Sequence, residues 1–295
     1  MTYEWLALSA ALLWALASLL SVKPALHLGT FTYSRWRMGL TSLTLFAVVL
    51  ISGQWVTLNV NAVITLAFSG FIGIFIGDTA LFACLNRMGP RQAGLLFSCH
   101  AVFSALMGYF LFHEALNTVE IGASCLVFLG VVTAIFFGRP KHSGPDLDKI
   151  KGNIGIGIAL GVIAAFCQAL GSILAKPIMQ TSVDPITGSA IRVVTAFIIH
   201  VIFFLSGAKI ARATQKMNLS IFMITFINSF LAMTLGMTLI LYALKAGNVG
   251  MVALLSSTTP IMLLPLLWIY TGRRPGRFAW IGALLAVIGT GVLVQ

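Results

Sequence analysis

Charged side chains are scarce in this sequence. Only 8% of its 295 residues are Asp, Glu, Lys or Arg, whereas 59% are hydrophobic. A soluble domain carries about a quarter of its residues as charged side chains, so the composition excludes a water-soluble fold. Apolar runs of about 20 residues, long enough to cross a hydrocarbon layer of ~30 Å, recur along nearly the whole chain. The sequence therefore predicts an all-α polytopic membrane protein.

Motifs for catalysis, nucleotide binding and metal binding are also missing. The chain has no phosphate-cradling Gly-Lys-Ser/Thr motif, no His/Cys/Asp/Glu cluster with metal-ligand spacing, and no nucleophile–base pair on a polar loop. These absences argue against an enzyme and against ATP as the driving force, and they predict neither cofactor nor metal. The formal net charge of +11 is attributed to orientation in the membrane, not to nucleic-acid binding.

Ten hydrophobic ranges are predicted to be transmembrane helices. They are 4–22, 30–52, 60–85, 90–112, 117–138, 153–175, 185–206, 219–244, 248–271 and 277–294. The longest polar segment, residues 139–151, lies midway between them and is typical of a solvated linker. We therefore divide the chain into a first group of five helices over residues 1–138, a cytoplasmic linker over 139–151, and a second group of five over 152–295.

The two groups of helices repeat one another in sequence, with matches that keep their order along the chain. The matched pairs are Lys23-Pro24 with Lys176-Pro177, Arg37 with Arg192, Gly77-Asp78-Thr79 with Gly236-Met237-Thr238, and Ile121-Gly122-Ala123 with Ile281-Gly282-Ala283. Because five is an odd number, the second group must enter the membrane from the opposite side. This predicts two inverted repeats, an architecture typical of secondary transporters with a site near the midplane between the repeats.

Two segments carry a resemblance to a known family. The segments 77-GDTALFACLNRMGPRQAGLL-96 and 236-GMTLILYALKAGNVGMVALLSSTTPI-261 resemble EamA-type transporters of the drug/metabolite transporter superfamily, as do 111-LFHE-114 and 281-IGALLAVIGTG-291. The resemblance covers essentially the whole chain. It implies gradient-driven transport of a small metabolite, such as an amino acid or a related compound, by alternating access, with export favoured over import.

The chain departs from the family pattern at three positions. The Pro expected in the fourth helix is replaced near His100, the Glu expected after the ninth helix is Arg273, and Asp78 has no acidic counterpart in the second group. An exactly symmetric site is therefore not expected.

Two alternatives to transport of a soluble metabolite stay open on the same fold. One is a non-transporting membrane scaffold, and the other is a protein that binds or flips a lipid carrier. Polar side chains inside the spans favour a hydrated pathway over a scaffold. The expected partners are a small-molecule substrate, the lipid bilayer and a proton as candidate coupling ion, but not nucleic acid. A monomer and a homodimer are both compatible with the sequence.

Basic residues predict the orientation, because Lys and Arg are retained on the cytoplasmic side. Six of the 18 lie at or beside matched repeat positions and so favour neither face. The other twelve all fall at loops that follow odd-numbered helices: Arg35, Arg91, Arg139, Lys141, Lys149, Lys151, Lys209, Arg212, Lys216, Arg273, Arg274 and Arg277. This predicts that both termini lie outside, in a bacterial inner (plasma) membrane.

Asp78 is the single acid deep in an apolar span. Burying a carboxylate there costs about 3 kcal/mol on insertion scales, so it is expected to face the interior. When protonated it is neutral and could couple transport to a proton. The structural alternative is a pair with a nearby Arg or a helix cap. Arg37 and Arg192 are either contacts for an anionic substrate group or residues that snorkel to the headgroups.

Further polar and aromatic residues within the spans are candidates for lining the pathway, with packing or interhelical hydrogen bonding as the alternative. They are Trp14, His100, Gln168, Asn228, Thr258, Thr259 and Pro260. The repeated Lys23 and Lys176 are expected near opposite membrane faces, where each is a candidate gate or interface residue. Each following Pro is expected to end its helix.

Overall fold

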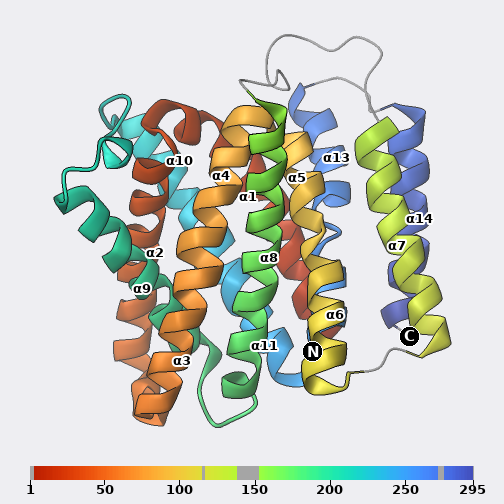
Figure 1. The fold of residues 1–295 in the computed structure, drawn as a ribbon, viewed down its shortest axis with the longest axis horizontal. Coiled ribbons are helices and arrows are strands. Elements are labelled where there is room, and N and C mark those ends of the chain that lie inside the picture. The colour runs from red at the N-terminus through yellow and green to blue at the C-terminus, as the bar shows by residue number, and fades with distance from the viewer. Residues whose placement is uncertain (1–2, 115–116, 138–152, 272–275, 295) are drawn as a thin grey trace.

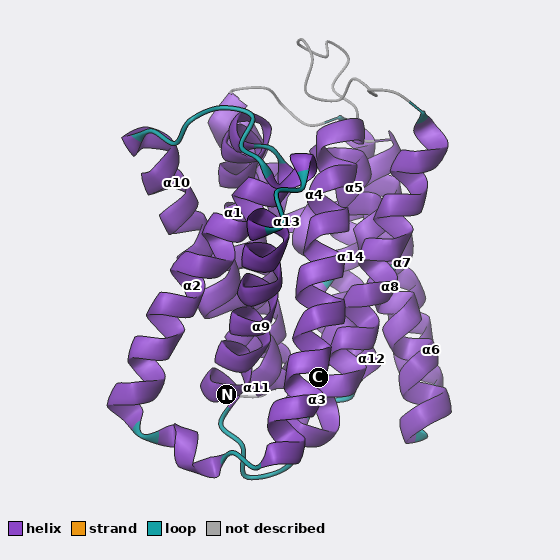
Figure 2. Cartoon of the chain, turned by 60° about the vertical axis from the view of Figure 1, so that its left-hand side comes forward, coloured by secondary structure: helices purple, strands orange, loops and turns teal. Residues whose placement is uncertain are grey.

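A computed structural model describes residues 3–114, 117–137, 153–271 and 276–294 of the chain. The predicted linker at 139–151 and Arg273 lie outside these described residues. Within them the chain is helical and contains no strand (Figure 2). Seven of the helices described are long and apolar enough to cross a membrane, and 118–133 and 277–289 form shorter apolar helices. The predicted polytopic, all-helical class is confirmed in this form.

The helix bounds follow the apolar runs. The N-terminal part contains α1 (Tyr3–Leu28), α2 (Thr30–Ser52), α3 (Val60–Gly70), α4 (Gly77–Met88), α5 (Pro90–Ser98), α6 (His100–Phe112) and α7 (Thr118–Phe137). The C-terminal part contains α8 (Ile154–Met179), α9 (Pro185–Leu205), α10 (Leu219–Ser229), α11 (Thr238–Ala246), α12 (Val249–Ser256), α13 (Thr259–Thr271) and α14 (Arg277–Val294). Short 3₁₀ turns, η1 (Gln54–Thr57) and η3 (Lys209–Ala211), follow α2 and α9.

Two long helices change to π-helical winding partway along their length. Segment η2 (Phe71–Ile76) joins α3 to α4, and segment η4 (Phe230–Met237) joins α10 to α11. Each long helix also begins at an asparagine whose side-chain oxygen accepts a first-turn backbone N–H, at 2.7 Å for Asn59 and 2.9 Å for Asn218. The apolar pattern does not predict the π segments, which occur frequently at functional sites in other proteins.

The fourth and ninth predicted helices are each broken near the middle. The break between α12 and α13 lies at Ser257 and Thr258, directly before a helical turn that contains Pro260. Proline lacks a backbone N–H and favours such an interruption. The break between α5 and α6 lies at Cys99, although no proline is present there.

Prolines at the ends of α1 and α8 behave differently from the prediction. Pro24 and Pro177 lie inside their helices, and α1 continues to Leu28. The interpretation that each Pro ends its helix is therefore wrong. A proline removes only one backbone donor, and the helix resumes beyond it, since the N–H of Gly29 donates to the carbonyl of Ala25 at 3.1 Å.

Helices from the two parts of the chain pack against one another. Helix α1 lies along α10, η4 and α11, while α8 lies along α3, η2 and α4. Helix α2 packs on α9, and α7 packs on α14 at one edge of the molecule (Figure 1). Both termini lie at the same end of the bundle (Figure 1).

Small side chains face the interior and large apolar ones face outward. On α1, Ala7 and Ala10 are fully buried, whereas Trp5 and Leu12 are exposed. Lipid tails are as apolar as leucine, so helix association in a membrane depends on close packing at small residues. Polar side chains of α2 and α9, such as those of Arg37 and Arg192, are buried in this interior.

Candidate functional site

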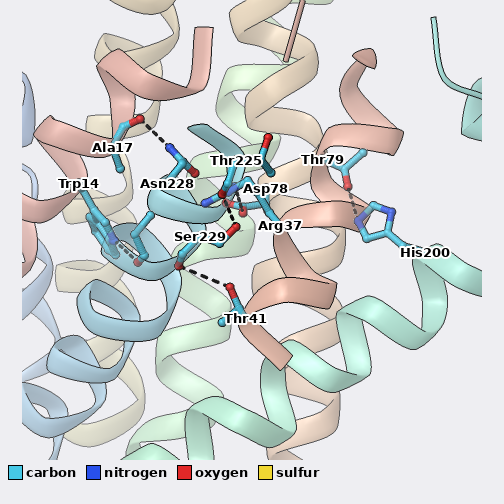
Figure 3. A network of polar contacts seen from close by, with 11 residues as sticks. Trp14, Ala17, Arg37, Thr41, Asp78, Thr79, His200, Thr225, Asn228 and Ser229 are labelled. Carbon is cyan, nitrogen blue, oxygen red and sulfur yellow. Dashed lines mark hydrogen bonds and ion pairs between the residues drawn. The ribbon is translucent and has the colours of Figure 1, made fainter. Parts of the chain in front are cut away.

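A buried ion pair joins α2 to α4. Nη1 of Arg37 lies 2.9 Å from Oδ2 of Asp78 (Figure 3), and the Arg37 side chain is 4% exposed. The guanidinium carbon also lies 4.8 Å from the ring centre of Phe82 and 5.6 Å from that of Tyr33. Asp78 stands in the first turn of α4, directly after η2. In this structure the guanidinium of Arg37 balances the charge of the Asp78 carboxylate. Binding of a proton to the carboxylate would also remove that charge.

Hydrogen bonds between α1 and the α10–η4 helix lie beside this pair. Nδ2 of Asn228 donates to the carbonyl of Ala17 at 2.6 Å, and Nε1 of Trp14 donates to the carbonyl of Ala232 at 2.9 Å (Figure 3). Ala232 lies within η4, where π winding changes the pairing of backbone carbonyls. Ala232 is buried, so the Trp14 indole supplies its carbonyl with a hydrogen-bond donor away from water.

Two threonines of α2 extend this polar cluster, although the sequence did not single them out. Oγ1 of Thr41 donates to the carbonyl of Ser229 at 3.4 Å, and Oγ1 of Thr44 lies 3.0 Å from Oγ1 of Thr234. The available signal was their spacing, because Thr41 lies one turn and Thr44 two turns beyond Arg37, on the same helix face. Helix α2 thus contacts the C-terminal part of the chain through polar groups.

The two interior histidines lie at separate places. His200 on α9 is buried, with Nε2 3.5 Å from Oγ1 of Thr79 and its ring centre 4.8 Å from that of Phe75 (Figure 3). His100 is buried at the start of α6, with its ring centre 5.1 Å from that of Phe97. The structure therefore places His200 next to the residue after Asp78, whereas His100 sits at the break of the fourth helix.

The remaining polar candidates bond locally or pack. The hydroxyls of Thr258 and Thr259 donate to carbonyls three residues earlier, each at 2.7 Å. Gln168 is buried on α8. The threonines therefore satisfy backbone carbonyls at the break before Pro260 and make no hydrogen bond to the Arg37–Asp78 pair within the described chain.

The two repeated lysines lie in different surroundings. Lys176 is buried on α8, with Nζ 3.1 Å from Oε1 of Glu114, and it also donates to the carbonyl of Gly247. Oε2 of Glu114 accepts the backbone N–H of Val249 at 2.8 Å. Lys23, by contrast, is exposed. Lys176 thus connects α8 to the end of α6 and to the α11–α12 turn, whereas Lys23 is at the surface.

Arg192 on α9 is fully buried, and its Nη1 lies 3.5 Å from Sδ of Met237. It packs between η2 and the end of η4: a Cβ added to Gly70 would meet the Arg192 backbone, and one added to Gly73 would lie 3.3 Å from Nη2. The two arginines that align in sequence therefore both point into the interior, and neither snorkels to a membrane surface in this structure.

Comparisons with known proteins give a consistent result. The model of the EamA-like transporter family matches residues 1–136 and 155–295. An uncharacterised transporter of Synechocystis is 23% identical over 240 residues, which are 80% of this chain and 64% of that protein, less than two thirds of its length. A "Probable amino-acid metabolite efflux pump" of Salmonella typhimurium is 26% identical over 235 residues, 77% of this chain and 75% of that protein.

The fold is also found among solved structures. One crystal structure superimposes with a TM-score of 0.78 over 98% of this chain and 95% of that chain, at 17% sequence identity. At that identity the likeness establishes the fold alone.

Proposed function

The chain belongs to the EamA-like transporter family, and we propose that it is a gradient-driven secondary transporter that moves a small metabolite by alternating access. It is an integral membrane protein of the transporter class and not an enzyme. An amino acid or a related compound is the proposed cargo, and export the proposed direction. The name of the Salmonella relative supports both. The proposed location is a bacterial inner membrane.

One observation carries this proposal: features of the N-terminal part recur in the C-terminal part and pack reciprocally. The π segments η2 and η4, the breaks after α5 and α12, and the packing of α1 and α8 on the opposite π-bearing helix all recur in pairs. This supports two inverted five-helix repeats, over residues 1–138 and 152–295. In such transporters the two repeats rock against each other around a site at their interface.

The Arg37–Asp78 pair is the proposed coupling element of this transporter. A carboxylate buried beside a guanidinium can release that guanidinium when it binds a proton. The structural alternative is a permanent brace between α2 and α4.

Lys176 and Glu114 form the proposed gate. Together with the backbone of Gly247 and Val249 they connect the N-terminal part, through the end of α6, to the C-terminal part, through α8 and α12. The end of α6 lies at the end of the bundle where the termini lie (Figure 1). If both termini are outside, the contact closes the outer face. Lys23 is exposed, and the position corresponding to Glu114 in the second repeat is Arg273, so no equivalent pair is expected on the inner face.

Replacing the two lysines separately tests the gate. Lys176→Gln should lower the initial rate of transport in proteoliposomes at least tenfold, because weakening the closed gate by about 1.4 kcal/mol shifts its equilibrium about tenfold. Lys23→Gln, the matched control, should change the rate less than about twofold, as expected for an exposed charge. Equal defects in the two variants would instead indicate a shared structural role.

The proposed orientation can be checked in cells. A reporter that is active only in the periplasm, fused after Gln295, is expected to be active, because the twelve unmatched basic residues favour cytoplasmic loops after odd-numbered helices. An inactive reporter on a protein that still transports would reverse the orientation and would move the Lys176–Glu114 gate to the inner face.

Transport itself is tested with purified protein in proteoliposomes, using a panel of labelled amino acids with and without a pH gradient. The expected result is accumulation of at least one amino acid that depends on the gradient. A folded protein that moves no amino acid, but moves a fluorescent lipid between leaflets, would favour the lipid-carrier alternative. A protein that moves neither would favour the scaffold.

A further inference from the structure

Arg192 is a buried cation that has no acidic partner among the described residues. Its side chain is fully buried, and within this part of the chain its Nη1 contacts the sulfur of Met237, at 3.5 Å. Its Nε and Nη2 have no hydrogen-bond partner among the residues that the structure describes. An arginine stays protonated in proteins, and its guanidinium offers five donors. Most of that donor capacity is unused at this position.

Arg37, which aligns with Arg192 in sequence, has an acidic partner at the matching position. Arg37 contacts Asp78, the residue after Gly77, and Arg192 contacts Met237, the residue after Gly236. The same contact is therefore made twice, once to a carboxylate and once to a thioether. A thioether is only a weak acceptor and carries no charge, so the positive charge is balanced in one part of the molecule and unbalanced in the other.

Glycine lies on one side of the Arg192 guanidinium. Gly73, in η2, lies beside Nη2, and Gly73 in turn faces Gly171 of α8, where an added Cβ would approach Gly73 Cα to 2.8 Å. These glycines let the backbones of η2 and α8 approach one another closely beside the guanidinium. Arg192 also lies between a π segment of each part of the chain, which is where the proposed movement of the repeats would open space.

We propose that Arg192 binds a carboxylate group of the transported molecule. This inference rests on the proposed transport function and names the chemical class of the cargo. An unpaired ionised group inside a membrane protein is costly to keep, and a guanidinium and a carboxylate form two parallel hydrogen bonds in a planar pair. The cargo then supplies the anion that Met237 does not, and amines or sugars without an acidic group are not carried.

Binding is measured first, on the full-length protein in detergent, with L-amino acids, the corresponding amino-acid amides, and chloride or phosphate as probes. At least one amino acid should raise the melting temperature of the wild type, and its amide should not. Arg192→Met should bind that amino acid about tenfold to a hundredfold more weakly, as the loss of a charge-assisted contact implies. Arg192→Lys should bind with intermediate affinity. Arg35→Met, which also removes one positive charge, should bind like the wild type.

A second readout separates a binding role from a structural one. Without ligand, Arg192→Met should melt at the same temperature as the wild type or higher, because an unbalanced buried charge is replaced by an apolar chain of similar length. A ligand-free variant that melts well below the wild type would show that Arg192 braces the fold, and would overturn the proposal. Equal stabilisation by amino acids and their amides, by chloride or phosphate alone, or by no probe would overturn it as well.

The failure of this inference can be told apart from the failure of the proposed function. A wild-type protein that carries amino acids in proteoliposomes, with Arg192→Met carrying them equally well, contradicts the carboxylate site alone. A wild-type protein that binds carboxylates through Arg192 but moves none of them contradicts transport alone.

Discussion

Arg37→Met is expected to lower the free energy of unfolding by about 3–5 kcal/mol, because it leaves the buried carboxylate of Asp78 without its partner. Asp78→Asn should also destabilise the protein, since Arg37 then faces a neutral amide. The double variant Arg37→Met/Asp78→Leu should recover most of the loss, because a well-packed apolar pair of similar volume is often as stable as a buried ion pair. Thermal unfolding of the three variants in detergent measures these differences.

The double variant provides the control within the same experiment. If it unfolds as easily as Arg37→Met alone, then the 2.9 Å contact between Arg37 and Asp78 is not the interaction that the single variants break. Non-additivity is the signature of two residues in direct contact.

The same variants separate the coupling role of Asp78 from a structural one. If Asp78 carries the coupled proton, Asp78→Asn should abolish accumulation driven by a pH gradient while exchange of cargo between equal pools continues. A variant with normal transport and intact proton dependence would remove Asp78 as a coupling group and would leave it as a brace between α2 and α4.

Gly70→Ala is expected to cause the second large effect, because the helices meet backbone to backbone at this position. A Cβ there would lie 2.3 Å from the carbonyl oxygen and 2.6 Å from the Cα of Arg192. Neither atom belongs to a flexible side chain, so α3 and α9 must move apart. Overpacking of this kind costs about 1–3 kcal/mol, and sometimes more. The melting temperature in detergent and the yield of folded protein measure the loss.

Gly122 offers a matched control on another helix. It lies in α7, and an added Cβ there would meet nothing within 4 Å. Gly122→Ala should therefore keep or slightly raise the stability, since alanine is about 1 kcal/mol better than glycine inside a helix. If Gly70→Ala and Gly122→Ala melt alike, the close contact between Gly70 and Arg192 does not limit helix packing.

Much of the fold could be predicted because lipid restricts the chain to few choices. Where water is absent, the backbone must satisfy its own hydrogen bonds, so a run of about 20 apolar residues becomes a helix almost regardless of its neighbours. Local signals did not locate the break before Pro260, because the ninth span was predicted as one helix over 248–271. They also failed at Pro24, which α1 accommodates, and at η2 and η4, whose π winding depends on the packing of whole helices.

The sequence predicted which residues belong to the candidate site better than it predicted which of them contact one another. Asp78, Arg37 and Arg192 were recognised because charges are rare in apolar spans, and an Asp–Arg pair was one of two alternatives for Asp78. The partners came from the structure alone. Glu114 bonds to Lys176, 62 positions away in the chain, and Arg192 meets Met237 where its counterpart meets an acid. The roles of these residues stay predictions until the variants are measured.

By itself, the sequence determined that this chain is an α-helical membrane protein, and it predicted that the two parts repeat one another, since hydrophobic length and repeated order are properties of the chain alone. Only the tertiary structure decided which buried charges are balanced. That balance depends on how α2, α9 and the π segments cross, because ion pairing requires atoms to approach within about 4 Å. Arg37 and Arg192 align in sequence, yet one guanidinium contacts a carboxylate and the other contacts a thioether.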